Sequence, residues 1–145
     1  MHLCSDGTYL TAVTFAGQKY ENGHIPTDAV SGSCGVLEQT KLWLRQYFDC
    51  KIPDFLPPVK PKGTAFQTRV WELLTEIPYG ETVTYGELAK KLGCKSAQAV
   101  GGAVGRNPIS ILIPCHRVVG TYGSLTGYAG GLEKKEFLLH LEETL

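Results

Sequence analysis

The spacing of apolar residues predicts an N-terminal unit built from a strand and a helix. Aromatic and β-branched residues crowd the segment from Tyr9 to Phe15, which Gly17 closes, and this composition is typical of a hairpin strand. The next segment, residues 20–35, is polar and rich in turn residues. Residues at helical spacing follow: Val36, Leu37, Thr40, Leu44, Tyr47 and Phe48. We therefore expect a helix that covers a small sheet.

A proline-rich connector separates this unit from a second one. The connector, residues 52–61, contains Pro53, Pro57, Pro58 and Pro61. Proline fixes φ and lacks an amide hydrogen, so no helix or central strand tolerates this density, and an extended linker is expected. The sequence therefore predicts an α/β (α+β) protein with two domains, residues 1–57 and residues 62–145, of which the second is mostly helical.

Two capping boxes mark helix starts in the second unit, one from Thr64 to Gln67 and one from Thr84 to Glu87. In each, the threonine side chain bonds a backbone amide three residues on, and the longer side chain bonds back. The first helix should end before Pro78. Its apolar stripe consists of Phe66, Val70, Leu73, Leu74 and Ile77.

The second of these helices and a third have the outline of a helix-turn-helix. We expect the second to stop at Gly93 and the third, which Ser96 opens, to cover residues 97–104. Its adjacent glycines, Gly101 and Gly102, each cost about 1 kcal/mol relative to alanine. A helix this bare allows close backbone approach, either to another helix or to a DNA groove. The sequence leaves both interpretations open.

Composition is typical of a folded protein without membrane segments. The chain has 145 residues and a formal net charge of +0, which argues against a protein that coats nucleic acid. No apolar run approaches membrane-spanning length and the first residues lack signal-peptide character, so we expect a cytoplasmic protein. The five cysteines are widely spaced, which predicts reduced thiols. Cys4, His24, Cys34 and Cys50 are candidate zinc ligands, but none of them has zinc-knuckle spacing, and we predict no metal.

Charge is unevenly distributed along the second unit. No acidic residue lies between Glu87 and Glu133. The basic residues of this window are Lys90, Lys91, Lys95, Arg106 and Arg117. They form either a surface that follows the phosphates of a nucleic acid or an ordinary surface whose counter-charges come from elsewhere in the fold.

The segment from Ile109 to Gly120 brings a thiol, an imidazole and a guanidinium together after an apolar run. Residues 111–113 are expected to form a short buried strand that Pro114 ends at Cys115. A thiol at the end of a rigid element, with a glycine-rich run at residues 120–131 behind it, can meet a ligand. The alternative is a small buried hydrophobic residue, since free cysteine is among the most buried residue types.

Three motifs together identify a family. The chain contains Pro-Cys-His-Arg-Val at residues 114–118, Asn-Pro at 107–108 and Gly-Tyr-Ala-Gly-Gly-Leu at 127–132. Over residues 63–142 it resembles the methylated-DNA–protein-cysteine methyltransferases, or O6-alkylguanine-DNA alkyltransferases. The resemblance implies irreversible, single-turnover transfer of an alkyl group from guanine O6 to Cys115, without a cofactor. Thymine O4 is a second candidate position.

The resemblance also implies roles around the thiol. His116 would activate Cys115 through a bridging water, because a free thiol with a pKa of about 8.5 is sparsely ionised at neutral pH. Glu142 would orient the imidazole, although the sequence alone favours a frayed surface residue near the C-terminus. Tyr85 would act near base N3 and the flanking phosphate.

The remaining substrate contacts follow from the same resemblance. Tyr128 and the backbone amide of Ala129 would lie near O6, and the carbonyls of Cys115 and Val118 would accept the guanine amino group. For Tyr85 and Tyr128 the alternative is packing with a satisfied hydroxyl. Asn107 would tie the helix-turn-helix to the cysteine segment, and Arg117 would buttress that segment.

The implied partner is double-stranded DNA, bound through the minor groove with the damaged nucleotide rotated out of the stack. Where relatives often carry an arginine that fills the gap, this chain has Gln98, which lacks the charge and stacking plane. Some relatives also have serine in place of Ala129, and relatives usually have a further strand before Tyr9. The candidate DNA-binding residues are Lys95, Ser96, Ala97, Gln98, Ala99, Gly101, Gly102 and Arg106.

The resemblance implies a ribonuclease H-like N-terminal unit, here shortened, a winged-helix C-terminal domain, and a monomer. Three other functions remain open at this point. A lesion-binding relative without catalysis would lack the acceptor thiol, which Cys115 supplies. A thiol hydrolase using Cys115, His116 and Glu142 would release product repeatedly. A winged-helix regulator would leave the cysteine segment unexplained.

Overall fold

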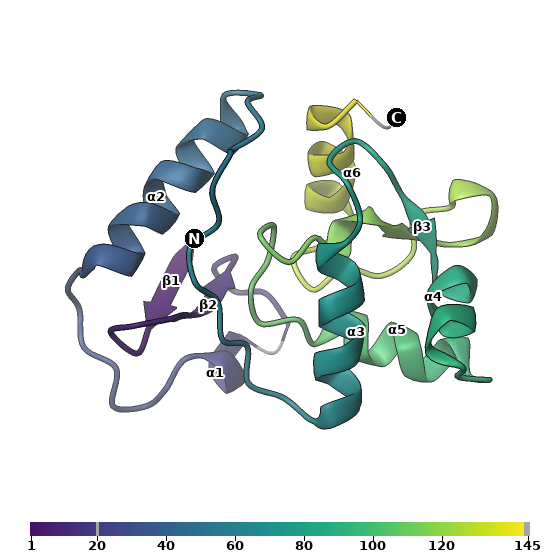
Figure 1. The fold of residues 1–145 in the computed structure, drawn as a ribbon, viewed down its shortest axis with the longest axis horizontal. Coiled ribbons are helices and arrows are strands. Elements are labelled where there is room, and N and C mark those ends of the chain that lie inside the picture. Colours follow the sequence, from purple (N-terminus) through teal and green to yellow (C-terminus); the bar gives the residue numbers. More distant parts are fainter. Residues whose placement is uncertain (20, 144–145) are drawn as a thin grey trace.

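The N-terminal unit pairs two strands under a helix. The computed structural model describes residues 1–19 and 21–143. Strand β1 (His2–Ser5) pairs antiparallel with β2 (Leu10–Thr14), and helix α2 (Gly35–Phe48) covers them, after a short α1 (Glu21–His24) (Figure 1). The predicted strand and helix are confirmed. A strand does precede Tyr9, although the sequence contains no signal for it: β1 is short and carries none of the aromatic or β-branched residues that are typical of strands.

The proline-rich connector is extended, as predicted, and it also belongs to the sheet. The Leu10 amide donates to the Pro58 carbonyl at 2.7 Å, and the Lys60 amide donates to the Leu10 carbonyl at 2.9 Å. Further along β2, the Val13 amide donates to the Pro108 carbonyl at 2.9 Å. Strand β2 therefore contacts both the connector and the segment that leads to the cysteine.

The three helices after the connector begin where their caps predict. Helices α3 (Ala65–Thr75) and α4 (Tyr85–Leu92) both open on complete capping boxes. Gly93 ends α4 in the left-handed conformation, with φ of 65°. The Ser96 hydroxyl caps α5 (Ala97–Gly105) by accepting from the Ala99 amide at 3.1 Å. The Trp71 indole donates to the Ala103 carbonyl at 2.9 Å, which fastens α3 to α5.

The segment before the cysteine is a turn, so the predicted strand over residues 111–113 was wrong. Ile111 has a positive φ of 72°, and the Ile113 amide donates back to the Ile109 carbonyl at 3.1 Å. The Asn107 side chain donates to the carbonyls of Ile109 and Ile113, at 3.2 and 2.8 Å, and accepts from the Ile109 amide at 3.0 Å. These bonds hold the loop in its place, and the apolar side chains are buried as they would be in a strand.

The segment after this turn forms two 3₁₀ turns, a short strand and the last helix. A 3₁₀ turn, η1 (Cys115–Arg117), leads into β4 (Val118–Val119), which pairs parallel with β3 (Val83–Thr84). A second 3₁₀ turn, η2 (Thr121–Gly123), and a loop precede α6 (Leu132–Leu141). Within the described residues, no helix is long and apolar enough to cross a membrane.

Candidate active site

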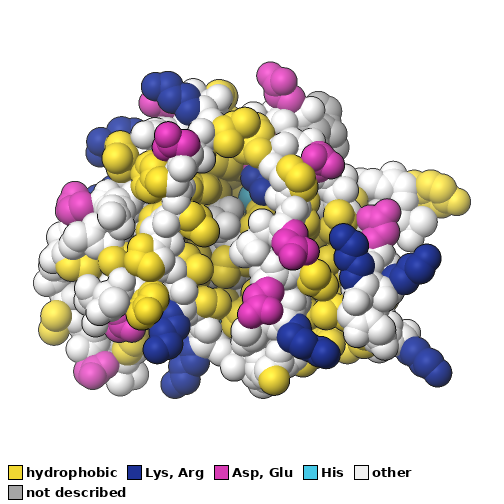
Figure 2. Space-filling view, in the orientation of Figure 1, with side chains coloured by type: hydrophobic (Ala, Val, Ile, Leu, Met, Phe, Trp, Pro, Cys, Tyr) yellow, Lys and Arg dark blue, Asp and Glu magenta, His cyan; other side chains and the backbone are white. Residues whose placement is uncertain are grey.

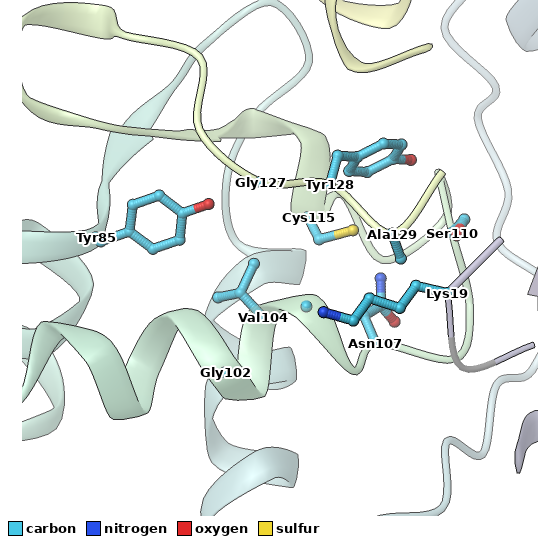
Figure 3. A pocket seen from close by; sticks show the side chains of 11 residues that line it. Lys19, Tyr85, Gly102, Val104, Asn107, Ser110, Cys115, Gly127, Tyr128 and Ala129 are labelled. Atoms are coloured by element: carbon cyan, nitrogen blue, oxygen red, sulfur yellow. The ribbon is translucent and has the colours of Figure 1, made fainter. Parts of the chain in front are cut away.

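Cys115 lies at a cavity of about 250 Å³ between α5 and the loop before α6 (Figure 3). Its side chain is 7% exposed. The cavity reaches the surface, because the exposed residues Gly102 and Gly127 line it as well. The lining residues are Lys19, Tyr85, Gly102, Val104, Gly105, Asn107, Ser110, Cys115, Gly127, Tyr128 and Ala129. The thiol is therefore buried in the fold yet faces a space that a ligand can enter.

The thiol needs activation. Burial raises the pKa of Cys115 above its ordinary value, and this outweighs the opposing effects of the Asn107 side chain and the Lys135 ammonium. Alkyl transfer requires the thiolate. A base near the sulfur is therefore part of any chemistry at this site.

His116, the next residue after Cys115 in the sequence, is fully buried and is bound to a carboxylate. Its Nε2 lies 2.6 Å from Oε2 of Glu142. Burial lowers the pKa of His116, which favours the neutral ring, and the carboxylate fixes the proton on Nε2. Nδ1 is then an acceptor, and it has no hydrogen-bond partner among the described residues.

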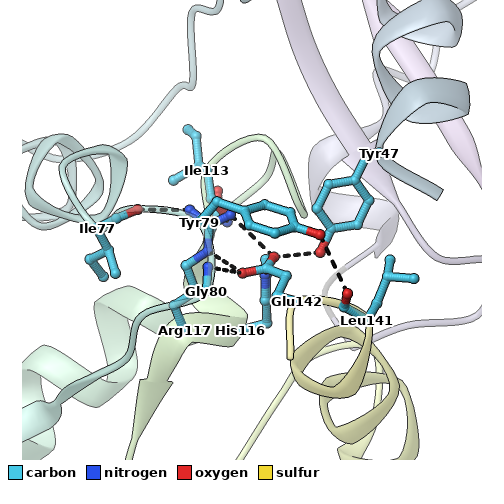
Figure 4. Close-up of polar contacts among 10 residues, drawn as sticks. Tyr47, Ile77, Tyr79, Gly80, Ile113, His116, Arg117, Leu141 and Glu142 are labelled. Carbon is cyan, nitrogen blue, oxygen red and sulfur yellow. Dashed lines mark hydrogen bonds and ion pairs between the residues drawn. The ribbon is translucent and has the colours of Figure 1, made fainter. Parts of the chain in front are cut away.

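Glu142 is the centre of a buried polar cluster at the end of α6 (Figure 4). Besides His116, it accepts from the Tyr47 hydroxyl at 2.5 Å, from Nε of Arg117 at 2.7 Å and from the Gly80 amide at 3.2 Å. Burial raises the pKa of Glu142, but the hydrogen bonds from His116 and Arg117 outweigh it and set the pKa at about 2. The alternative of a frayed surface residue was wrong, since Glu142 is 3% exposed.

Arg117 supports the cluster and takes no part in a basic surface. Its guanidinium donates to Glu142 and, at 2.7 Å, to the Ile77 carbonyl. These bonds are consistent with the buttressing role expected for Arg117. Because Arg117 is buried, it does not belong to the candidate DNA surface, although it is one of the five basic residues between Glu87 and Glu133. Figure 2 shows Lys and Arg side chains along the edge of the molecule where Figure 1 places α4.

The two tyrosines of interest line the cavity from opposite sides. The Tyr85 hydroxyl donates to the Thr126 carbonyl at 3.2 Å, and burial raises the pKa of Tyr85. The Tyr128 hydroxyl is buried and near Cys115, without a well-formed hydrogen bond to any residue that the structure describes. Burial raises the pKa of Tyr128 well above its usual value, so this hydroxyl stays protonated and can donate. Tyr85 therefore agrees with the alternative of a packed tyrosine whose hydroxyl has a hydrogen-bond partner, and Tyr128 does not.

Not every expected contact residue reaches the cavity. Ala129 lines it, but Val118 does not: it is fully buried in β4, immediately after η1. His116 also lies outside the cavity lining.

Lys135 is a site residue that the sequence analysis missed. It is 0% exposed, and its ammonium donates to the carbonyls of Thr126 and Gly127 at 2.9 and 3.1 Å. Burial lowers the pKa of Lys135 to about 8, while the charge of Cys115 acts in the opposite direction. Its position three and four residues before the buried Leu138 and Leu139 places a lysine on the apolar face of α6, which is the signal that could have found it.

The predicted DNA-binding residues of α5 are exposed, except Gly101, which is half-buried. Val100, Ala103 and Val104 are buried against the fold. A Cβ at Gly101 would meet the Tyr85 ring at 3.9 Å, whereas a Cβ at Gly102 would meet nothing within 4 Å. Packing within the protein therefore does not explain Gly102. The exposed residues are Lys95, Ser96, Ala97, Gln98, Ala99, Gly102 and Arg106.

The candidate zinc ligands do not assemble. Among the described residues, no group of three or more histidine, cysteine or acidic side chains could hold a metal ion.

A cysteine in a cavity beside a helix-turn-helix is the arrangement expected of a DNA-binding protein that carries a reactive thiol, and the comparisons agree with this class. Residues 65–144 match the family model described as "6-O-methylguanine DNA methyltransferase, DNA binding domain". A methylated-DNA–protein-cysteine methyltransferase of Haemophilus influenzae is 46% identical over 143 residues, which cover 97% of this chain and 79% of the relative.

Solved structures give the same result. The structure of Mycobacterium tuberculosis OGT in complex with DNA matches with a TM-score of 0.86 and 40% identity, covering 98% of this chain and 85% of that one. An O6-methylguanine DNA methyltransferase from Methanococcus jannaschii matches with a TM-score of 0.72 and 34% identity, covering 99% and 88%. The chain belongs to the methylated-DNA–protein-cysteine methyltransferase family. It binds DNA and repairs alkylated guanine directly, by transfer of the alkyl group to a cysteine.

Proposed function

We propose that Cys115 is the acceptor cysteine, that transfer is irreversible, and that each molecule acts once. The observation that supports this assignment most directly is that Cys115, alone among the five cysteines, lines the cavity. The thiolate attacks the alkyl carbon, a sulfur–carbon bond forms, and the bond from that carbon to guanine O6 breaks with its electron pair going to guanine. The resulting thioether is chemically stable, so the protein is spent.

The proton of Cys115 leaves through His116. Nδ1 of His116 is a buried acceptor without a protein partner in the described part of the chain. A water between Sγ and Nδ1 would satisfy this atom and carry the proton. Glu142 holds the ring in the required tautomer and stabilises the imidazolium that forms. Glu142 and His116 act on the reaction through this relay.

Lys135 supports the thiolate from behind the loop. Its charge favours the ionised form of Cys115 and opposes the effect of burial. It also holds the carbonyls of Thr126 and Gly127 and so fixes the loop that carries Tyr128.

The leaving guanine is stabilised by donors on the cavity wall. The protonated hydroxyl of Tyr128 and the backbone amide of Ala129 donate hydrogen bonds to O6, and the departing base takes its proton from solvent. The carbonyl of Cys115 accepts from the exocyclic amino group, and Tyr85 approaches N3 and the neighbouring phosphate. The lining of the cavity by Tyr85, Tyr128 and Ala129 supports this assignment.

Double-stranded DNA lies along α5, with its minor groove toward Gly102 and the damaged nucleotide rotated into the cavity. The bare, exposed surface of α5 supports this placement, since the minor groove is only about 6 Å wide. Gln98 fills the gap that the nucleotide leaves, by hydrogen bonds to the orphaned base, and holds DNA more weakly than an arginine would. Lys95 and Arg106 contact phosphates.

The finer architecture follows the family. We infer a reduced ribonuclease H-like unit over residues 1–57 and a winged-helix domain over residues 62–145, acting as a cytoplasmic monomer without a cofactor. Methylated thymine O4 is a secondary substrate. The pairing of β3 with β4 next to α4 supports the winged-helix assignment.

Peptide mass mapping tests the acceptor assignment. The protein is incubated with a duplex containing O6-methylguanine, digested and analysed. A methyl increment on the peptide that holds Cys115, absent in Cys115→Ser, is expected. A methyl group on the peptide of Cys34 or Cys94, or tight binding of the duplex without modification, would overturn it.

A further inference from the structure

The N-terminal unit reaches the cavity through the turn that follows β2. The Lys19 amide donates to the Ala129 carbonyl at 3.1 Å. The Phe15 ring packs edge-on against Tyr128, with centroids 6.1 Å apart, and a Cβ at Gly130 would lie 2.6 Å from the Phe15 ring. The turn and the substrate loop therefore fit together too closely for an additional methyl group. Lys19 is held at the cavity by its backbone.

The Lys19 side chain forms part of the cavity wall. Figure 3 shows it running past Ala129 and Asn107, with its ammonium end directed to the space below Cys115, near Val104. Among the described residues that line the cavity, Lys19 has the only charged side chain. Lys135 donates to loop carbonyls and does not line the cavity.

We propose that Lys19 is a specificity-determining residue that favours O6 substituents ending in a negative charge, with carboxymethyl as the simplest case. The proposal rests on Cys115 being the acceptor, because the substituent then lies next to the sulfur. An ammonium on the cavity wall attracts a carboxylate carried into the same space, and partial exclusion of water strengthens this attraction. A neutral substituent of equal size gains nothing from the charge.

The reaction itself is unchanged. The Cys115 thiolate attacks the methylene carbon of the carboxymethyl group, a sulfur–carbon bond forms, and the bond to O6 breaks with its electron pair going to guanine. The carboxylate keeps its charge throughout. Lys19 binds the substituent and exchanges no proton.

The test compares single-turnover rates on three duplexes that differ only at O6: methyl, carboxymethyl and carbamoylmethyl guanine. Carboxymethyl and carbamoylmethyl have the same shape and differ in charge. The ratio of their rates is measured in the unchanged protein, in Lys19→Met, in Lys19→Arg, and in Lys134→Met. Lys134 lies nearby, over the Phe15 ring, but does not line the cavity, which makes it the matched control.

We expect the carboxymethyl to carbamoylmethyl ratio to fall about fivefold in Lys19→Met, to be retained in Lys19→Arg, and to be unaltered in Lys134→Met. An unaltered ratio in Lys19→Met would overturn the proposal. So would an equal loss on all three duplexes, which would assign Lys19 to the DNA backbone. Failure of the unchanged protein to accept methyl on Cys115 would refute the acceptor assignment instead, and the methyl duplex detects that case separately.

Discussion

Replacement of Glu142 by glutamine tests the buried cluster, because it keeps the size of the side chain and removes its charge. The carboxylate accepts from Tyr47, His116, Arg117 and the Gly80 amide. An amide offers one oxygen and a donor, so some of these donors lose their acceptor. Arg117, 8% exposed, loses its counter-charge, and breaking a buried pair costs about 3–5 kcal/mol.

The lowered pKa of Glu142 gives a second, independent value for the free energy that this carboxylate contributes to stability. A shift from 4.5 to about 2 corresponds to about 3 kcal/mol of native-state stabilisation at neutral pH. The two figures agree. We therefore expect Glu142→Gln to lower the free energy of unfolding by about 3–5 kcal/mol, measured by denaturant titration.

The same replacement should slow transfer separately from its effect on folding. The amide of glutamine donates to Nε2 of His116, which moves the ring proton to Nδ1 and closes the relay to Cys115. General-base assistance contributes about 10²- to 10⁴-fold, so a loss in this range is expected in the single-turnover rate per folded molecule. Glu136→Gln is the control, since Glu136 lies on the same helix and is 56% exposed. A Glu142→Gln protein as stable and as fast as this control would refute the reasoning.

Three further predictions concern stability, the thiol and DNA. The depressed pKa of Glu142 contributes stability above pH 4.5 that is lost as the pH falls toward 2, so acid titrations of Glu142→Gln should be flatter than those of the unchanged protein over this window; identical curves would contradict this. Lys135→Met should move the midpoint of Cys115 alkylation by iodoacetamide to higher pH and slow it several-fold at pH 7.5, and an unmoved midpoint would show that the ammonium does not act on the thiol. Gly102→Ala should raise the free energy of unfolding by about 1 kcal/mol yet weaken duplex binding, measured by denaturation and by titration; undiminished binding would remove α5 from the interface.

Helix starts were predictable because their signals are local. Each capping box joins residues three apart, and both were found where the sequence placed them. The glycine stop of α4 was predictable for the same reason. An apolar run is ambiguous by comparison: residues 111–113 are buried, but Asn107 holds them as a turn by bonds to carbonyls that no pattern of side chains reveals.

The reactive thiol was predictable from a motif, whereas its supporting partners were not. Tyr47 contacts Glu142 across 95 residues of sequence, and only the fold brings α2 to the end of α6. Lys19 reaches the cavity for a similar reason, through pairing of its turn with the loop at Ala129. Such contacts depend on how the two units dock, which local spacing does not encode.

The central claim is that Cys115 takes one alkyl group and keeps it. A titration measures this most directly: a fixed amount of protein is mixed with increasing excess of duplex containing O6-methylguanine, and repaired guanine is counted after the reaction stops. We expect a plateau at one repaired base per active protein molecule, with the methyl group retained on the protein. Repair that continues past this plateau, with unmodified protein recovered, would contradict the account and favour a thiol hydrolase.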